Sequence, residues 1–364
     1  MPPAHDGTPH APQPAGPQRV ARGAATNPAN RFERLHFVAD PDADPDASAL
    51  PEPTLLLRDP SRTVLSTNQS PDVGFDTSLN PYRGCEHGCA YCYARPTHEY
   101  LGFSAGLDFE TKILVKQDAP RLLRAALASP RWKPQVVALS GATDAYQPAE
   151  RRLRITRRCL EVFAEFRNPV AIVTKSALVA RDADLLADLA RFDAAAVNVS
   201  ITTLDDDLRR RLEPRTAAPR ARLKAIEALS GAGVPVGVMV APVIPGLNES
   251  EIPAILEAAK RAGAGSAHLI ALRLPHGVAD LFEDWLERHV PERRSKVMNR
   301  VRSLRDGRIN DPRFHSRMRG RGVFADQIQD LFALACRRAG IATEGPELSA
   351  SAFRNPGDTQ LSLL

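Results

Sequence analysis

The sequence has few cysteines and no long apolar run, and these absences exclude several classes of protein. It contains 5 cysteines in 364 residues, three of them in one short run, so it does not hold a disulfide framework. No stretch approaches the about 20 apolar residues that cross a bilayer. The start, MPPAHDGTPHAPQPAG, lacks the apolar core of a secretory signal peptide. We therefore expect a cytoplasmic protein without a membrane segment.

The composition is typical of a globular chain with one large core. Hydrophobic residues make up 43% of the sequence and charged residues 25%. A net charge of +5 makes the chain mildly basic, which alone says little about its partners. The first fifty residues are rich in Pro, Ala and Asp and show no period, which predicts disorder.

Strand and helix patterns alternate through the middle of the chain. The expected strands are Thr77 to Asn80, Val136 to Ser140, Val170 to Thr174, Ala196 to Ile201, Val236 to Val240 and Ala267 to Leu272. Helical patterns such as ERRLRITRRCLEVFAEF and EIPAILEAAKRAG lie between them. Six such units predict an α/β fold with a parallel sheet and outer helices, and they are too few for a complete eight-stranded barrel.

These patterns divide the chain into five parts. We expect a disordered N-terminal tail over 1–50, an N-terminal extension over 51–76, the α/β unit over 77–290, a basic helical extension over 291–345 and a disordered tail over 346–364.

The run SLNPYRGCEHGCAYCYAR places Cys85, Cys89 and Cys92 in a CxxxCxxC spacing. A [4Fe-4S] cluster takes one ligand per iron, so three cysteines in one loop leave one iron free to bind a reacting molecule. The alternative is a zinc site with His87 as the fourth ligand. All four zinc ligands would then come from one tight turn, whereas structural zinc sites usually pair ligands from two loops. Cys159 and Cys336 lie in apolar helical patterns and are expected to be buried thiols.

The cysteine run resembles the cluster loop of the radical S-adenosylmethionine (SAM) enzymes, CxxxCxΦC, with Tyr91 at the aromatic position. The resemblance implies a partial (β/α)6 barrel of the TIM type. It also implies that the open iron binds SAM, which is cleaved reductively to a 5′-deoxyadenosyl radical. The electron would come from a donor such as flavodoxin or ferredoxin.

Polar residues after the expected strands are candidates for SAM binding, because ligands gather at the carboxyl ends of parallel strands. Asp144 stands where many radical SAM enzymes bind the SAM amino group. Lys175 is suited to pair with the SAM carboxylate as a compact charge. Ser200 and Thr202 are placed to face the ribose, although strand threonines are common without such a role.

From about Arg62 to Ala339 the chain resembles a bacterial radical SAM family related to spore photoproduct lyase. The resemblance rests on segments such as SPDVGFDTSLNPYRGCEHGCAYCYARPTHEYLG, TDAYQPAERRLRITR and VGVMVAPVIPGLNE. The lyase uses a cysteine after its second strand to return a hydrogen atom, and here that region reads LSGATDAYQ. Tyr146, Tyr93 or Tyr100 are the candidates to relay a hydrogen atom instead.

Two further segments point to a nucleic-acid partner. Between Arg293 and Arg321 there are eleven Lys or Arg residues and two Asp, with Phe314 and His315 among the arginines. This mixture favours phosphate contacts with base stacking, and a solvated helical face is the alternative. The last five residues, Gln360, Leu361, Ser362, Leu363 and Leu364, resemble the peptide by which bacterial repair proteins bind the DNA sliding clamp.

The sequence therefore predicts a radical SAM enzyme that acts on DNA, in repair or base modification, by a lyase-like or modifying reaction. One alternative is a radical SAM enzyme that modifies RNA or a peptide. A second is an iron–sulfur protein that binds DNA or senses redox state without turnover.

Overall fold

Six parallel strands, hydrogen-bonded in chain order, form the main sheet. The computed structural model describes residues 22–33 and 53–358. The strands are β3 (Thr77–Leu79), β6 (Val137–Leu139), β7 (Val170–Thr174), β8 (Ala195–Ser200), β9 (Val236–Val243) and β10 (Ser266–Ala271). They confirm the six strands predicted from the sequence. β2 (Leu65–Thr67) pairs antiparallel with β3, so β2 and β10 are the two edges of an open sheet.

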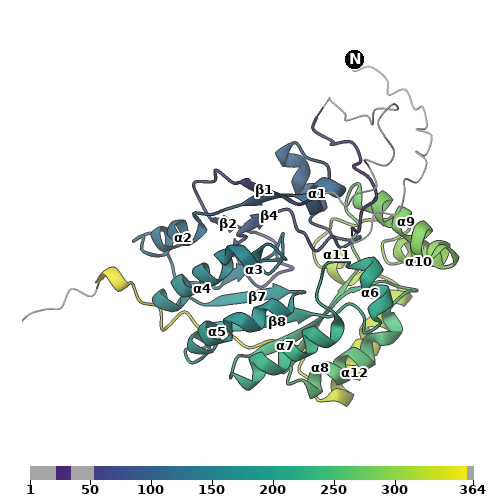
Figure 1. Cartoon of the computed structure of the whole chain (residues 1–364). Helices are drawn as coiled ribbons and strands as arrows, with labels where there is room; N and C mark the ends of the chain where they lie inside the picture. The colour runs from purple at the N-terminus through teal and green to yellow at the C-terminus, as the bar shows by residue number, and fades with distance from the viewer. Residues whose placement is uncertain (1–21, 34–52, 359–364) are drawn as a thin grey trace, which may run out of the picture.

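Helices pack along the outer side of this sheet, as the alternating pattern predicted. They are α2 (Ala119–Leu127), α4 (Ile155–Phe166), α5 (Ala183–Ala190), α7 (Pro219–Gly231) and α8 (Ile252–Arg261). Figure 1 shows α4, α5, α7 and α8 in a row beside the strands. Leu160 and Phe163 of α4 are fully buried in the main core. The face of the sheet under these helices is buried, whereas Val173 of β7 is 37% exposed.

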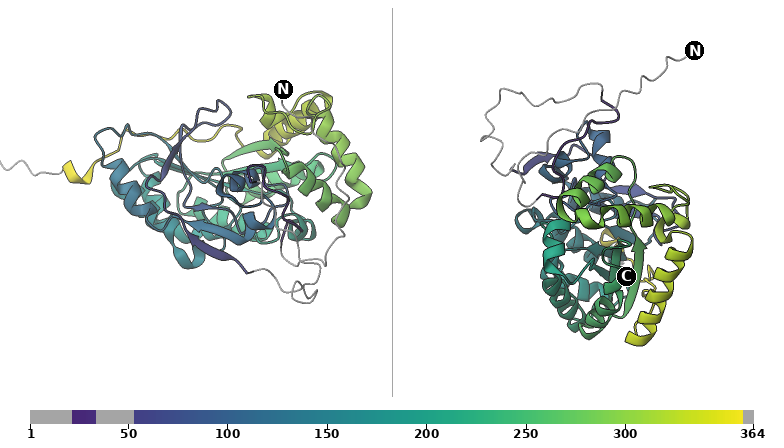
Figure 2. Two further views of the ribbon diagram at one scale, coloured as in Figure 1. Left: turned by 90° about the horizontal axis from the view of Figure 1, so that it is seen from above. Right: turned by 90° about the vertical axis from the view of Figure 1, so that its right-hand side faces the viewer.

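The C-terminal helices follow β10, which is an edge strand of the main sheet. They are α9 (Val278–His289), α10 (Pro291–Ser303), α11 (Ser316–Arg319) and α12 (Val323–Ala339). Phe332 and Cys336 of α12 are buried in the main core, and Ala342 bridges to Ser266 of β10. Figure 2 shows α12 beside the outermost strand. The predicted basic extension is therefore partly a layer of the α/β unit.

Residues 346–358, within the expected C-terminal tail, also contact the core. Phe353 lies 6.1 Å from Phe166 of α4, and the Arg354 amide donates to the Phe166 carbonyl at 2.9 Å. A short helix, η4 (Pro356–Asp358), follows. Residues 359–364, which hold the predicted clamp-binding peptide, lie outside the described residues.

A second, three-stranded sheet flanks and supports the cysteine run. It contains β1 (Leu55–Arg58), β5 (Lys112–Val115) and β4 (Tyr82–Arg83), in that order. Two short helices lie between β4 and β5, η1 (Arg95–Leu101) and α1 (Leu107–Thr111). The remaining elements are α3 (Glu150–Leu153), η2 (Ala177–Asp182), α6 (Asp206–Leu212) and η3 (Glu249–Glu251). The strands on either side of the cysteine run are thus hydrogen-bonded to each other.

Residues 22–33 fall within the tail that was expected to be disordered, and here the structure differs from the prediction. This segment passes beside α1, where Ala24 packs against Leu107 and Leu281. Most of its contacts are backbone and polar side-chain hydrogen bonds and close approaches at glycine, which leave no hydrophobic period in the sequence. Residues 1–21 and 34–52 lie outside the described residues.

The fold bears on two further expectations, the burial of Cys159 and Cys336 and the length of the helices. Cys159 and Cys336 are buried, 0% and 1% exposed, in the main core, and burial raises the pKa of both thiols. Among the helices in the described ranges, none has the length and apolar character needed to span a bilayer.

We expect Leu160→Ala to lower the free energy of unfolding by about 2–5 kcal/mol, because it leaves a cavity in the main core. Leu55→Ala is the matched control, since Leu55 is 51% exposed on β1, and its cost should stay below about 1 kcal/mol. Urea denaturation followed by circular dichroism measures both. Similar losses for the two variants would contradict the assignment of α4 to the core.

Candidate functional site

The cysteine run forms a tight loop directly after β4. The Cys85 amide donates to the Phe109 carbonyl at 2.8 Å, and the Ala90 amide donates to the Leu212 carbonyl at 3.0 Å. Gly84 and Gly88 have φ of 78° and 64°, a left-handed conformation that favours glycine. These contacts come from α1 and α6, so the loop is held on two sides.

Two buried polar side chains fix the backbone of this loop. The Gln147 amide oxygen accepts from the Glu86 amide at 2.9 Å, and its nitrogen donates to the Gly84 carbonyl at 3.2 Å. The guanidinium of Arg95 donates twice to the Cys89 carbonyl, at 2.9 and 3.1 Å. The backbone next to Cys85 and Cys89 is therefore ordered by side chains rather than by regular secondary structure.

The three cysteines are free thiols at this loop. Cys85 and Cys89 are buried and Cys92 is partly exposed. Burial raises the pKa of the Cys89 thiol well above its usual value and that of Cys92 to about 11. The thiols of Cys89 and Cys92 therefore need a nearby positive charge to become the thiolates that bind a metal. The donor set, three cysteine sulfurs on one ordered loop, fits an iron–sulfur cluster.

The structure gives less support to the zinc alternative. Nδ1 of His87 lies 3.3 Å from Asp144, and this carboxylate raises the pKa of the imidazole to about 10 against the opposing effect of burial. Nδ1 of His87 thus faces the Asp144 carboxylate. Within residues 22–33 and 53–358, no three His, Cys, Asp or Glu side chains are grouped as they would be around one ion. Cysteines that each bind a different iron need not converge on one point.

Asp144 connects the cysteine loop to the end of β7. Besides His87, its carboxylate accepts from the Thr174 hydroxyl at 2.8 Å and the Lys175 amide at 2.8 Å. It also accepts from the Tyr146 amide at 2.8 Å. Hydrogen bonds from these groups and the charge of His87 outweigh burial and lower the pKa of Asp144. The predicted amino-group acceptor therefore already holds several donors of the protein itself.

Lys175 gathers the other residues predicted to bind SAM. Its ammonium donates to Ser200 at 2.8 Å, to Thr202 at 3.0 Å and to the Ala241 carbonyl at 2.8 Å, and it lies 5.7 Å from the Tyr91 ring. Four of the five predicted cofactor-binding residues thus meet around one charge. The fifth, Asp144, contacts the backbone of the same lysine.

Glu213 and Arg222, which the sequence did not single out, complete this network. Glu213, fully buried after α6, lies 3.2 Å from Lys175, pairs with Arg222 and accepts hydrogen bonds from Tyr91 and Thr202. These cations and donors overcome the cost of burial and lower the pKa of Glu213. A carboxylate within RRRLEPR has no hydropathy signal of burial, so the sequence pattern did not reveal it.

Tyr93 and Arg273 lie where the first and last parts of the sheet approach each other. The Tyr93 hydroxyl donates to the Gly141 carbonyl after β6. The guanidinium of Arg273, two residues after β10, lies 5.6 Å from the centre of the Tyr93 ring. Nε of Arg273 is buried and has no hydrogen-bond partner, and no carboxylate of the described residues pairs with this arginine.

The other two candidate tyrosines lie elsewhere. Tyr146 is buried in the main core, with its ring 6.0 Å from the Arg181 guanidinium. Tyr100 is 73% exposed and stacks on Phe32 at 4.9 Å. Of the three predicted hydrogen-atom relays, Tyr93 is the one that directly follows Cys92 in the cysteine run.

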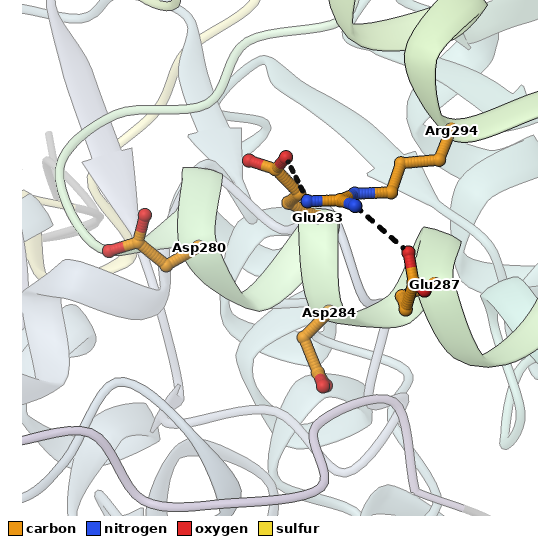
Figure 3. A pocket seen from close by; sticks show the side chains of 5 residues that line it. All are labelled: Asp280, Glu283, Asp284, Glu287 and Arg294. Carbon is orange, nitrogen blue, oxygen red and sulfur yellow. Dashed lines mark hydrogen bonds and ion pairs between the residues drawn. The ribbon is translucent and has the colours of Figure 1, made fainter. Parts of the chain in front are cut away.

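A pocket of about 320 Å³ between α9 and α10 contains none of these residues. It is lined by Asp280, Glu283, Asp284, Glu287 and Arg294 (Figure 3). Arg294 lies between Glu283 and Glu287, at 2.8 and 3.1 Å. This acidic cluster is an ion-pair network at the surface and adds nothing to the cysteine site.

Comparisons with known proteins agree with this geometry. Residues 79–259 match the Radical SAM superfamily. The uncharacterised protein Rv2578c of Mycobacterium tuberculosis is 38% identical over 250 residues, which cover 68% of this chain and 72% of the relative. The uncharacterised protein MJ0683 of Methanocaldococcus jannaschii is 28% identical over 173 residues, 48% of this chain and 62% of the relative.

Solved structures of spore photoproduct lyase share the fold. A double mutant with bound AdoMet and dinucleoside spore photoproduct superposes with a TM-score of 0.54 at 16% identity, over 81% of this chain and 82% of the lyase. A single mutant gives a TM-score of 0.51 over 78% and 79%. At this identity the likeness concerns the fold and not the reaction.

The superfamily match spans the cysteine loop, Lys175, Ser200 and Thr202 in one continuous region. The similarity to the mycobacterial relative covers 68% of the chain. The chain belongs to the radical SAM superfamily.

Proposed function

We propose that the protein holds a [4Fe-4S] cluster on Cys85, Cys89 and Cys92, binds SAM beside it and uses it on nucleic acid. Membership of the superfamily implies SAM and an iron–sulfur cluster. When bound, these groups supply the radical chemistry, and the protein aims it. One observation supports the assignment most strongly: residues chosen separately from four loops meet around Lys175, next to the cysteine loop.

The chain's own residues have distinct parts in this proposal. Lys175 offers a positive charge to the SAM carboxylate, but its three N–H groups already bond to Ser200, Thr202 and Ala241. SAM binding must therefore exchange at least one of these bonds. Glu213 holds the Lys175 ammonium during this exchange. Its carboxylate lies 3.2 Å from the ammonium and is itself held by Arg222 and Tyr91. Tyr93 is the proposed hydrogen-atom relay.

The proposal of a nucleic-acid substrate rests on positive charge at the site and beside it. Arg273 forms no ion pair with a carboxylate of the described residues, and its Nε has no hydrogen-bond partner. Its guanidinium lies over the ring of Tyr93, which follows Cys92. A phosphate is the kind of group that would complete its hydrogen bonds. Arg308, Arg319 and Arg321 are exposed and form no ion pair within the described ranges. These side chains favour a phosphodiester ligand.

Some arginines between Arg293 and Arg321 are already paired with aspartates, so fewer of them belong to the proposed DNA-contact surface. Arg313 pairs with Asp311 and Asp306, and Arg317 pairs with Asp72. These two arginines hold the loop before α11 in shape. Phe314 and His315 are left exposed on that loop, where they are available for base stacking.

Other readings remain as alternatives to be separated by experiment. A radical SAM enzyme for RNA or peptides would use the same cofactor site with a different substrate surface. An iron–sulfur protein without turnover would hold the cluster and not cleave SAM. The interaction of residues 360–364 with a sliding clamp stays a prediction, as does electron donation by flavodoxin or ferredoxin.

We expect Cys85→Ala, Cys89→Ala or Cys92→Ala each to abolish the cluster in protein reconstituted without oxygen, because three ligands leave no redundancy. Iron and sulfide analysis with EPR measures the result. Cys159→Ala is the control and should retain iron, since that thiol lies in the main core. Zinc without iron in anaerobically purified protein would overturn the assignment.

We expect Lys175→Met to weaken SAM binding roughly tenfold or more, since hydrogen bonds to charged groups contribute about 1.5–3 kcal/mol. Calorimetry under nitrogen measures the affinity, and EPR checks that the cluster signal without SAM is unchanged. Lys260→Met, on the outer helix α8, should bind SAM like the parent. An unchanged affinity in Lys175→Met would remove Lys175 from the SAM site.

We expect the triple variant Arg308→Ala, Arg319→Ala and Arg321→Ala to bind DNA more weakly and to reduce the slope of log K against log salt by about 3. The control removes the same charge elsewhere, through Arg261→Ala, Arg337→Ala and Arg338→Ala on α8 and α12. Fluorescence anisotropy over a salt series measures both variants. Equal losses of DNA affinity in the two triple variants would mean that only net charge matters. If the parent protein does not bind DNA, DNA is not its substrate.

A further inference from the structure

The segment from residue 22 to residue 31 lies directly against the cysteine loop. The Gly23 amide donates to one carboxylate oxygen of Glu110 at 3.1 Å, and the Ala24 amide donates to the other at 2.9 Å. Glu110, in α1, is fully buried. A part of the chain some sixty residues before the cysteines therefore shares a buried charge with the element behind them.

The same carboxylate reaches the cysteine loop through Arg95. Nη2 of Arg95 donates to Glu110 at 2.5 Å, and Nε and Nη2 donate to the Cys89 carbonyl at 3.1 and 2.9 Å. The other terminal nitrogen, Nη1, donates to the carbonyls of Ala105 and Gly106. Arg95 is 0% exposed, so all its donors are used inside the protein. Contacts thus run without a break from Gly23 to Cys89.

Glycine is required where the segment crosses the loop. A Cβ at position 23 would lie 1.8 Å from the Gly88 carbonyl oxygen, inside the cysteine run. A Cβ at position 106 would lie 2.0 Å from the Thr26 carbonyl oxygen. These distances are well below any contact between real atoms, so backbone meets backbone at both crossings.

Further along, the segment is held by a separate group of contacts. Asn27 and Asp108 exchange hydrogen bonds at 2.8 and 3.0 Å. Arg31 pairs with Glu99 at 2.7 Å, and Asn30 donates to the Glu99 carbonyl at 2.9 Å. These contacts dock the segment on η1 and α1 without touching the backbone of the cysteine loop. They provide the comparison for the contacts that do.

Burial makes the contacts at Glu110 sensitive to loss. A buried ion pair is stable only when its remaining donors and acceptors are satisfied. Without the amides of Gly23 and Ala24, the Glu110 carboxylate keeps Arg95 but loses two N–H partners. It would then draw water or pull Arg95 away from the Cys89 carbonyl.

We propose that Gly23 and Ala24 belong to the cluster-binding module and that Glu110 is a positioning residue, which fixes the backbone of Cys89 through Arg95. The segment also closes the loop against solvent at Gly88. This role concerns the retention of the cluster and the order of the loop, and it does not depend on the choice of substrate.

The first experiment uses Gly23→Ala in the full-length chain. The added methyl group displaces the segment, while Glu110 and Arg95 remain. We expect anaerobically reconstituted protein to lose iron to a chelator about tenfold faster than the parent, as loss of hydrogen bonds to a buried charge implies. In iron-free protein, hydrogen exchange of the peptide that contains residues 85–92 should rise, while exchange in β7, β8 and β9 stays unchanged.

The second experiment separates positioning from simple docking. Glu110→Gln removes the charge and replaces one acceptor by a donor that faces Arg95 or the amides. Glu99→Gln is the matched control, because it weakens the same segment at Arg31 and leaves Arg95 and Cys89 alone. Glu110→Gln should accelerate iron loss and loop exchange as Gly23→Ala does, Glu110→Asp should restore part of the difference, and Glu99→Gln should resemble the parent.

Two results would overturn the proposal. One is iron loss and loop exchange at parental values in Gly23→Ala. The other is an equal effect of Glu99→Gln, which would mean that the segment acts only by covering η1. If Glu110→Gln does not fold, Gly23→Ala decides alone, since it leaves every buried charge in place.

Discussion

The ion pair between Lys175 and Glu213 is the interaction on which the site depends. A fully buried carboxylate is costly to remove from water, and Glu213 is stable there because Lys175, Arg222, Thr202 and Tyr91 all direct charge or hydrogen bonds to it. The ends of β7 and β8, the turn after α6 and the cysteine loop are thereby fixed relative to one another. Much of the cofactor site is therefore organised by the protein's own contacts.

This organisation has a cost for binding. The Lys175 ammonium and the Asp144 carboxylate, which the sequence marked for the two charged ends of SAM, are both hydrogen-bonded within the protein. A ligand gains affinity only by the difference between its own bonds and those it replaces. In the proposed site, these polar contacts would limit how tightly SAM binds while fixing its position. Precise placement matters more than affinity when a reactive group must meet one bond of a substrate.

The sequence predicted the strands well and the buried charges poorly, for a physical reason. The six strands are short runs of mostly buried apolar residues, so burial and sequence pattern agree. Glu110, Arg95 and Glu213 are as buried as any core leucine, but a hydropathy pattern assigns charged residues to the surface. Residues 22–33 were missed for a related reason, since glycine and backbone amides dock them without any apolar period. The CxxxCxxC spacing records ligand chemistry directly, and the polar residues chosen at the strand ends lie together around Lys175 because parallel strands end at one edge.

The hydrogen bond between Tyr91 and Glu213 joins residues that lie 122 positions apart, and this separation bears on the order in which the protein is made. Neighbouring strands of the sheet are also neighbours in the chain, so the α/β units can assemble one after another during synthesis. The cysteine loop emerges near the beginning of that process. Its supports at Leu212, Glu213 and Arg215 emerge much later. The cysteines are thus complete as a motif long before they are complete as a site, and a newly made chain must reach the end of α6 before the loop takes its final shape.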